Sequence, residues 1–598
     1  MKNSGCRALL RTNRAIFQCQ NFCQKVTLAA VIFCAFAPAS FAQDAGGKEA
    51  GLGQIRSYIA AGWDTLTRSM VDCKTVVDPK LAAASVLYLP ADFDAPAAVQ
   101  EMQKRCNVQV KHLPQVIHKL GEVDTSNLEP PGLLYLDNKY VVPGGRFNEM
   151  YGWDSYFIVR GLVDDKRVEL ARGMVENFFF EIEHYGAVLN ANRTYYLTRS
   201  QPPFLTSMIL AVYNARPTSL HTSALKEKAE AEQDRAWLAR AYEYAKRDYT
   251  LWTHEPHLAG STGLSRYYDF GSGPAPESVK DETGHYRQVA AFFLGQPDLE
   301  RTLLIRKPSG QTSPLTVGPT YSLQVCEVAR TIGNPACDAV EDIALSDEYY
   351  KGDRAMRESG YDVSFRFGPH GVRTHHFAPV CLNSLLYKTE KDLEVISGLL
   401  RRDEESEEWK KRAADRKERI QKYLWDSERG MYFDYDFENQ TRSSYEYVTT
   451  FFPLWAGIPS QEQAKALLQH LATFEKPGGL VMSPKETGAQ WDFPYAWAPD
   501  QLVADEGIRR YGFDQEANRV SYEFLSTVAE NFRRDGTIRE KYNAVTRSSE
   551  TQVTAGYHMN IVGFGWTNGV FLVLLRELPQ DSVTRLAKEQ SGKAGSGR

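Results

Sequence analysis

Helical periodicity is the main signal in this chain from about residue 160 onward. Apolar residues recur every three or four positions, which is typical of helices with one buried face. The longest such stretches are 168–185, 232–253, 391–425, 461–473, 516–531 and 567–578. Strand-like runs such as 431–437 are short and do not alternate with helices, as they would in a Rossmann or (β/α)8 fold. The pattern predicts a mainly helical protein.

The loops between these helices hold most of the unusual chemistry. Glycine, proline, aromatic and charged residues cluster in 143–157, 187–204, 258–278, 357–371, 484–501 and 535–566. Because sites commonly lie on loops held by a rigid scaffold, we expect a helical toroid whose mouth gathers these loops. We predict a catalytic domain over 143–580, an N-terminal helix and loop-rich strap over 43–142, and a disordered C-terminal tail over 581–598.

The first 42 residues have the layout of a secretory signal peptide. They carry basic but no acidic residues, then an apolar run from Val26 to Phe36, and small residues that end at Ala42. The sequence Ser-Phe-Ala at 40–42 resembles a cleavage site, and the apolar run is too short to span a bilayer comfortably. A retained membrane anchor is the alternative. The pattern predicts a periplasmic or secreted protein that has no membrane attachment after cleavage.

Composition excludes several classes of protein. With 43% hydrophobic and 24% charged residues, the 598-residue chain is neither disordered nor a polytopic membrane protein. Its net charge of −5 provides no basic field for nucleic acid. An oxidising compartment would allow disulfides, and the candidate pairs are Cys73 with Cys106 and Cys326 with Cys337, which leaves Cys381 as a buried thiol. The spacing does not suggest a zinc site, and neither a metal nor another cofactor is expected.

The loop clusters share a composition suited to sugars. Aromatic faces stack on the apolar face of a pyranose, while carboxylate, guanidinium and amide groups bind hydroxyls. Hydrolysis of a glycosidic bond needs two carboxyl groups, one that protonates the leaving oxygen and one that activates water or attacks carbon. The sequence contains no Ser nucleophile elbow, HExxH, P-loop or kinase motif. Taken singly, each carboxylate could equally cap a helix or pair with an arginine.

Two of the clusters resemble the signatures of the trehalases, glycoside hydrolase family 37. Residues 143–156 read PGGRFNEMYGWDSY and residues 490–499 read QWDFPYAWAP, and both match at every fixed position. Further similarity covers NRTYYLTRSQPP at 192–203, LNSLLY at 382–387, EKY at 540–542 and GFGWTNG at 563–569. The resemblance implies an all-α (α/α)6 toroid with short β segments in its loops. It also implies hydrolysis of α,α-trehalose to two glucose molecules, with inversion and without a metal.

The resemblance also implies roles for particular residues. Asp362, in the sequence SGYD, stands where the family has its general acid, and Glu540, in EKY, stands where it has its general base. The positions that match substrate-binding residues of the family are Arg146, Trp153, Asp154, Asn190, Arg199, Ser200, Gln201, Glu277 and Gly360. Lining or supporting roles are expected for Arg366, Trp491, Asp492 and Trp497.

The sequence departs from the family pattern in three places. Ala275 replaces an arginine, Tyr361 replaces a tryptophan in the acid motif, and the lid segment has Tyr557 in place of a glutamate and no glycine run. The segment 279–357 is also longer than expected. It contains three arginines that are candidates to replace the lost cation: Arg301, Arg306 and Arg330.

These departures leave two alternatives to a trehalase open. One is a related inverting α-glucosidase that acts on another disaccharide or oligosaccharide. The other is a sugar-binding homologue with impaired catalysis. In each case the expected partner is a disaccharide, with no nucleic acid, and the protein is expected to be a monomer.

Overall fold

The computed structural model describes residues 50–78, 84–215, 224–281, 284–294, 296–307, 318–325, 339–557 and 559–592. The predicted signal peptide lies outside these residues, as do Cys326, Cys337 and Arg330.

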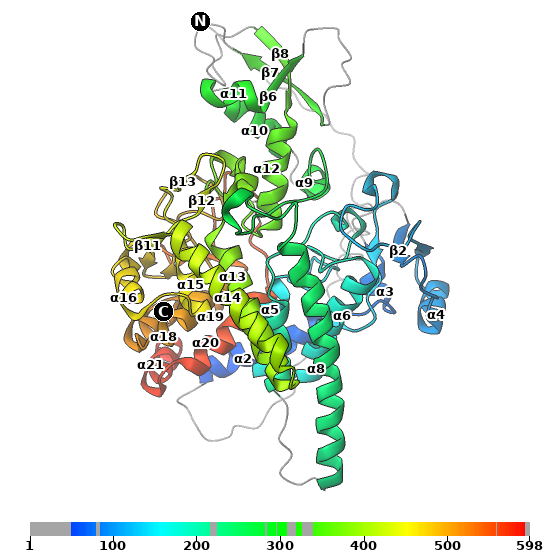
Figure 1. Ribbon diagram of the computed structural model, residues 1–598, viewed down its shortest axis with the longest axis vertical. Coiled ribbons are helices and arrows are strands. Elements are labelled where there is room, and N and C mark those ends of the chain that lie inside the picture. The colour runs from blue at the N-terminus through cyan, green and yellow to red at the C-terminus, as the bar shows by residue number, and fades with distance from the viewer. Residues whose placement is uncertain are drawn as a thin grey trace, which may run out of the picture. The chain divides into compact units, whose positions relative to one another are not determined.

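An inner ring of helices builds the main body (Figure 1). In chain order its members are α5 (Asp154–Asp164), α7 (Leu205–Asn214), α13 (Val380–Leu399), α15 (Phe452–Ala456), α18 (Ala498–Arg510) and α20 (Gly565–Glu577). Each of these helices packs against the next one, and α20 packs back against α5, which closes the ring.

A second helix follows each inner helix in the sequence. These helices are α6 (Val168–His184), α8 (Ala224–Trp252), α14 (Asp403–Tyr423), α16 (Gln461–Leu468), α19 (Asp514–Asp535) and α21 (Gln580–Gly592). The N-terminal helix α2 (Ala50–Leu66) packs against α19, α20 and α21. Six helix pairs around a closed ring are an (α/α)6 toroid, so the predicted fold class is confirmed.

The burial pattern of each helix matches its layer. The inner helix α20 is buried continuously from Gly565 to Leu575, as expected for a helix that is apolar all round. The outer helix α14 buries a single stripe of residues at helical spacing: Trp409, Ala413, Arg416 and Ile420. The break expected within 391–425 falls between α13 and α14.

Two glycines allow α5 and α20 to approach closely. A Cβ atom at Gly161 would lie 2.3 Å from the Cα atom of Gly569, and one at Gly569 would lie 2.2 Å from the carbonyl oxygen of Phe157. Any side chain at either position would therefore force the helices apart. This contact explains the glycine that ends the GFGWTNG sequence.

The segment expected to be a loop-rich strap contains a small parallel sheet. Strands β2 (Ser85–Leu89), β3 (Val108–His112) and β4 (Leu133–Leu134) pair in the order β3-β2-β4, with α4 (Ala97–Arg105) between β2 and β3. Sequence analysis missed this unit because its strands are short and because β2 is buried along its whole length, which removes the alternation that marks an exposed sheet.

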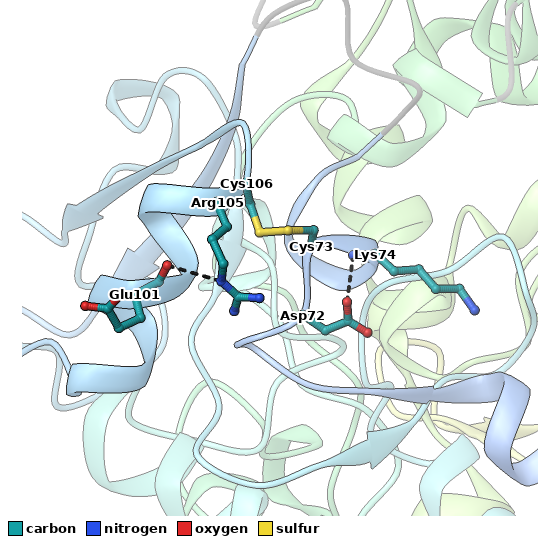
Figure 2. Close-up of a disulfide and its surroundings, with 6 residues drawn as sticks. All are labelled: Asp72, Cys73, Lys74, Glu101, Arg105 and Cys106. Carbon is teal, nitrogen blue, oxygen red and sulfur yellow. Dashed lines mark hydrogen bonds between the residues drawn. A yellow bond between two sulfur atoms is a disulfide. The ribbon is translucent and has the colours of Figure 1, made fainter.

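A disulfide joins Cys73 to Cys106, with their Cα atoms 5.3 Å apart (Figure 2). It links the start of α3 (Cys73–Val76) to the residue that follows α4. Asp72 caps α3 by accepting a hydrogen bond from the main-chain N–H of Lys74 at 3.1 Å. The pairing is one of the two that the sequence allowed, and Cys381 is buried and free, as expected.

The long segment before the candidate acid forms a small subdomain. It contains α9 (Pro276–Asp281), α10 (His285–Leu294), α11 (Pro297–Leu303) and the antiparallel strands β6 (Leu304–Lys307), β7 (Thr320–Val325) and β8 (Ala339–Leu345), ordered β6-β8-β7. Tyr286, Phe293 and Ile343 belong to its own hydrophobic cluster. Helix α12 (Asp347–Glu358) leads from β8 toward the ring (Figure 1).

The chain end differs from the sequence prediction. Residues Gln580–Gly592 form α21, which packs against α2 and α19. The predicted disordered tail over 581–598 is therefore wrong up to residue 592. This segment is an amphipathic helix that buries Leu586 and Ala587. Among the described residues, no helix has the length and apolar character needed to cross a membrane.

Candidate active site

The loops that precede α5, α7, α18 and α20 contribute to one cavity of about 720 Å³. This volume is in the range of small-molecule sites. All predicted catalytic and substrate-binding residues except Ser200 line it: Arg146, Trp153, Asp154, Asn190, Arg199, Gln201, Glu277, Gly360, Asp362 and Glu540.

Ser200 does not line the cavity, contrary to the sequence prediction. Its hydroxyl donates to the carbonyl oxygen of Val188 at 2.6 Å, and its main-chain N–H donates to Glu358 Oε1 at 3.2 Å. The side chain therefore fixes the loop from behind. Its neighbour Gln201 lines the cavity and accepts a hydrogen bond from the main-chain N–H of Trp153 at 3.0 Å.

Asp362 lies on the loop that follows α12. Gly360 turns this loop with φ +78°, and a Cβ atom there would lie 2.8 Å from Trp153 Cε2, so the position requires glycine. The Asp362 side chain is 29% exposed, and its Oδ2 atom lies 3.6 Å from Nη1 of Arg357. Arg357 is itself held by Asp353, whose Oδ2 accepts from Nε at 3.2 Å.

Glu540 lies at the start of a short antiparallel strand pair. Strand β17 (Lys541–Asn543) pairs with β16 (Tyr495–Trp497), which places Lys541 opposite Trp497. The Glu540 side chain is 2% exposed. Its Oε1 atom accepts a hydrogen bond from the hydroxyl of Tyr557, and its Oε2 atom accepts one from Lys541 Nζ at 3.2 Å. The carboxylate is thus buried with one cationic and one neutral donor.

Lys541 is unusual because its ammonium group is buried beside the carboxylate of Glu540. Burial lowers the pKa of its ammonium, and the charge of Glu540 opposes this shift. The ammonium also lies 4.8 Å from the ring centre of Trp497 and 4.1 Å from that of Tyr557. Aromatic faces therefore replace much of the water that a lysine would otherwise hold.

Asp154, the first residue of α5, interacts electrostatically with both candidate catalytic carboxyl groups. Burial raises its pKa well above the usual range, and the charges of Glu540 and Asp362 raise it further. A proton on Asp154 turns it into a hydrogen-bond donor toward the cavity.

Arg199 lines the cavity and donates hydrogen bonds to three side chains. Its Nε atom donates to Asn190 Oδ1 at 2.8 Å, and Nη1 donates to Asp269 Oδ2 at 3.4 Å. Its Nη2 atom donates to Glu277 Oε1. Glu277 Oε2 is buried with no hydrogen-bond partner among the described residues. This oxygen is therefore available to a ligand.

Position 275 lacks the arginine of the family pattern, but another cation contacts this loop. Ala275 is fully buried, does not line the cavity, and donates its N–H to the Tyr286 hydroxyl at 2.8 Å. Arg354 lies behind it and donates to the carbonyl oxygens of Gly273 at 2.8 Å and Pro274 at 3.1 Å. It also donates to Asp269 at 2.9 Å.

Of the three arginines proposed from the sequence as replacements, the two described ones are not seen beside position 275. Arg306 pairs with Glu300 and Glu341 inside the inserted subdomain. Arg330 lies outside the described residues, and Arg301 does not line the cavity. Arg354 and Arg357, at the far end of the same segment, supply the charge.

An aromatic wall completes the cavity. Trp153, Trp491 and Trp566 line it, and the rings of Trp491 and Trp566 lie 5.8 Å from that of Trp153, measured between centroids. Trp497 stacks on Trp491 at 3.8 Å with an interplanar angle of 8°, so it supports the wall from behind. Such a wall matches the apolar faces of pyranose rings.

Asp492 and Arg366, which were expected to line or support the site, have supporting positions. Asp492 accepts hydrogen bonds from the main-chain N–H of Phe365 at 2.9 Å and from the Ser364 hydroxyl at 3.1 Å, which fixes the loop after Asp362. Arg366 is fully buried, and its Nε donates to Asp434 at 2.7 Å.

Sequence reasoning missed several residues of the cavity wall. Tyr557 stood out only as a departure in the lid, and Arg357 lies just outside the SGYD sequence. The length of 279–357 was the only signal for α10, which contributes His285 and Gln288 to the cavity. The other missed residues include Phe147, Glu149, Tyr151, Arg193, Tyr196 and Phe564.

A family model described as Trehalase matches residues 54–292 and 329–579. The chain belongs to the trehalase family. It is therefore a glycoside hydrolase, and the matched segments contain every residue described above as lining the cavity.

Individual relatives agree with this membership. The cytosolic neutral trehalase of Kluyveromyces lactis is 35% identical over 567 residues, which cover 86% of this chain and 69% of the relative. The cytosolic neutral trehalase of Saccharomyces cerevisiae is 33% identical over 573 residues, which cover 86% and 70%. The structure of neutral trehalase Nth1 from Saccharomyces cerevisiae matches with a TM-score of 0.70 at 31% identity, over 90% of this chain and 96% of that one.

The relatives correct the prediction of cellular location. Both curated relatives are named as cytosolic, which contradicts the predicted signal peptide and the predicted periplasmic or secreted location. A basic segment followed by a short apolar run is a common pattern, and by itself it was insufficient evidence for export.

Proposed function

We propose that the protein hydrolyses α,α-trehalose to two glucose molecules by an inverting acid–base mechanism. The observation that carries this proposal is that Asp362 and Glu540 line the same aromatic-walled cavity of a trehalase-family chain. A disaccharide is a suitable occupant, because the cavity of about 720 Å³ combines apolar walls with several charged hydroxyl-binding groups.

In this mechanism Asp362 donates a proton to the glycosidic oxygen as the bond to the anomeric carbon breaks. Glu540 removes a proton from a water molecule that attacks the opposite face of that carbon. Tyr557 and Lys541 hold the Glu540 carboxylate from one side, which orients it toward the water. Arg357 lies close to Asp362 and orients the acid.

The remaining predicted residues bind the sugar hydroxyls. Glu277 accepts from a hydroxyl through its unpartnered oxygen, while Arg199 donates to its other oxygen. Asp154, whose pKa is raised by burial, donates a hydrogen bond to a sugar hydroxyl. Arg146, Asn190 and Gln201 complete the polar lining, and Trp153 packs on a ring face. No metal ion and no other cofactor takes part in the proposed steps, and we expect the protein to act as a monomer.

The test compares glucose release from trehalose with release from a panel of other disaccharides. We expect trehalose to be the best substrate. Ala275 does not line the cavity, so the absence of an arginine there does not open the site to a different sugar. A better rate on another α-linked disaccharide would favour a related α-glucosidase instead. Trehalose binding without glucose release would favour a sugar-binding homologue.

A pair of variants separates the acid from the base. Both Asp362→Asn and Glu540→Gln should lower kcat on trehalose about 10²–10⁴-fold. With α-glucosyl fluoride, whose leaving group needs no proton, Asp362→Asn should recover most of its loss while Glu540→Gln should not. The same defect for both variants on both substrates would contradict the assignment.

NMR spectra recorded early in the reaction determine the stereochemistry of hydrolysis. Inversion should give equal amounts of α- and β-glucose from trehalose, since only one ring is attacked. Formation of α-glucose alone would indicate retention and would contradict the proposed mechanism.

A further inference from the structure

A cluster of potential metal ligands lies outside the cavity, where α12 meets the short helix η5 (Thr374–His376). It consists of Glu348, His375 and His376, whose ligand atoms all lie within 4.8 Å of one another. None of the three lines the candidate active site. We propose that this cluster binds a divalent transition-metal ion, with zinc as the best match.

The two histidine rings are directed at the same oxygen atom. The Nε2 atoms of both His375 and His376 lie 3.2 Å from the same carboxylate oxygen, Oε1 of Glu348. Zinc bonds to nitrogen and oxygen are about 2.0–2.2 Å long, so neighbouring ligand atoms of a tetrahedral site lie about 3.3–3.6 Å apart. The two histidine–glutamate separations are close to that edge length, with small adjustments needed on binding.

The two histidines face each other against the tendency of their backbone. Successive residues of a 3-10 helix point about 120° apart, because the helix has about three residues per turn. The rings of His375 and His376 nevertheless lie with their centroids 4.0 Å apart and direct Nε2 to one oxygen. The two rings therefore meet at the Glu348 carboxylate, which brings three potential metal ligands together.

Both histidines of the cluster are largely buried. The His375 side chain is 5% exposed and that of His376 is 19% exposed. The Nδ1 atoms of both rings are buried and have no hydrogen-bond partner among the described residues. Each ring therefore offers Nε2 as its ligand atom, and a water molecule could occupy the fourth position of a tetrahedral ion.

The donor set also selects the class of ion. Two imidazoles and one carboxylate suit zinc and the neighbouring first-row ions, whereas calcium and magnesium prefer oxygen ligands alone. The two nearby arginines are engaged by other groups. Arg266 donates to the carbonyl oxygen of His375 at 3.0 Å, and Arg373 is paired with Asp436 at 2.7 Å.

The position of the cluster gives the ion a structural role. Glu348 lies in the first turn of α12, and the other end of α12 carries Arg357 and leads to Asp362. At 1.5 Å per residue, Glu348 lies about 15 Å along the helix from its last residue. The ion would join α12 to η5 and so fix the helix from which the candidate acid extends.

The experiment uses the full chain, stripped of metal with a chelator, and zinc alone as the titrant. Calorimetry should show one equivalent of zinc bound per chain. Cobalt in place of zinc should give the visible absorption bands of a tetrahedral site. Zinc should also raise the Tm of the stripped protein.

Two ligand variants and one control decide the assignment. Both His376→Gln and Glu348→Gln should weaken zinc binding about 100-fold or more, because each removes a ligand. His254→Gln changes an exposed histidine that follows α8 and contacts the carbonyl oxygen of Thr250, and this variant should bind zinc as the wild type does. The Tm of each variant in chelator shows whether the metal-free fold is intact.

The result that overturns the proposal is also specific. Zinc binding that is absent from the stripped wild-type protein, or that is equal in His376→Gln and His254→Gln, would show that the cluster is only a hydrogen-bonded histidine–glutamate group. These measurements do not use trehalose hydrolysis, so they stand or fail separately from the proposed function.

Discussion

The side-chain amide of Gln490 donates a hydrogen bond to the main-chain carbonyl oxygen of Asp362. The oxygen of the same side chain accepts one from Lys541 Nζ at 3.4 Å, and Lys541 holds Glu540. Gln490 is 1% exposed and belongs to the second signature sequence. This sequence therefore joins the loop of the candidate acid to the strand of the candidate base.

A Gln490→Leu variant should keep the fold and lose most of the activity. Leucine fills a similar volume but cannot donate to Asp362 or accept from Lys541. We expect kcat on trehalose to fall about 100-fold, the effect of a misplacement of about 1 Å, with a smaller change in KM. Steady-state kinetics and the Tm test this expectation together. A normal kcat would show that the two loops are positioned without this bridge.

A Tyr557→Phe variant tests the hydroxyl that donates to Glu540. A hydrogen bond to a charged group is worth about 1.5–3 kcal/mol, so kcat/KM should fall about 10–100-fold. Phenylalanine keeps the ring that packs on the Lys541 ammonium. The matched control is Tyr495→Phe, which removes a hydroxyl that accepts from Gln552 away from the cavity, and it should have little effect. Equal losses in the two variants would contradict the role of Tyr557.

The raised pKa of Asp154 predicts a pH-dependent cost to stability. In the folded protein its pKa lies well above the value of 3.8 for an ordinary side chain, because of burial first and of Glu540 and Asp362 next. Between those values the folded protein holds a proton that the unfolded chain has lost. The stability from this group is therefore complete below about pH 3.8 and is lost as the pH rises through the raised pKa.

An Asp154→Asn variant removes this titration because its amide stays neutral. The free energy of unfolding of the variant, relative to wild type, should therefore increase as the pH rises above about 4. Urea denaturation over a pH series measures the difference. Asp248→Asn provides a comparison, since burial raises the pKa of Asp248 to about 7 and its difference should develop up to that pH. A difference for Asp154→Asn that does not change with pH would contradict the prediction.

An Ala275→Arg variant tests whether Arg354 replaces the arginine missing from the loop. The new guanidinium would be buried near Arg354, and we expect a loss of about 3–5 kcal/mol in stability, together with lower activity. Adding Arg354→Ala should restore part of both losses, because it removes the like charge. An increase in kcat/KM on trehalose from Ala275→Arg alone would show that position 275 faces the sugar after all.

The sequence predicted the ring and most of the candidate site residues that line the cavity, for two different reasons. The inner and outer helices differ in periodic burial, and that pattern is local. The cavity residues lie in long motifs, so resemblance found them even though Arg146 in the first motif and Glu540 are far apart in the chain. The two candidate catalytic roles themselves stay predictions until the variants are measured.

The remaining errors share a physical cause. Ser200 lies in a matching motif, but its hydroxyl turns to Val188, and side-chain direction is not visible in a sequence. Arg357 and Arg354 are polar residues of a helix, and only the fold shows that they reach the cavity or its supporting loop. The parallel sheet of β2 and β3 depends on pairing between segments, which local patterns do not report.

The close contact of Gly161 and Gly569 has a consequence for how the protein is made. It joins the first inner helix to the last, so the ring stays open until α20 has left the ribosome. Trp153 and Trp566, which face the same cavity, come from segments that begin these two helices. A nascent chain that ends before Gly565 therefore exposes the apolar face of α5 and has an incomplete cavity wall. Synthesis must therefore be nearly finished before the cavity that would hold a sugar is complete.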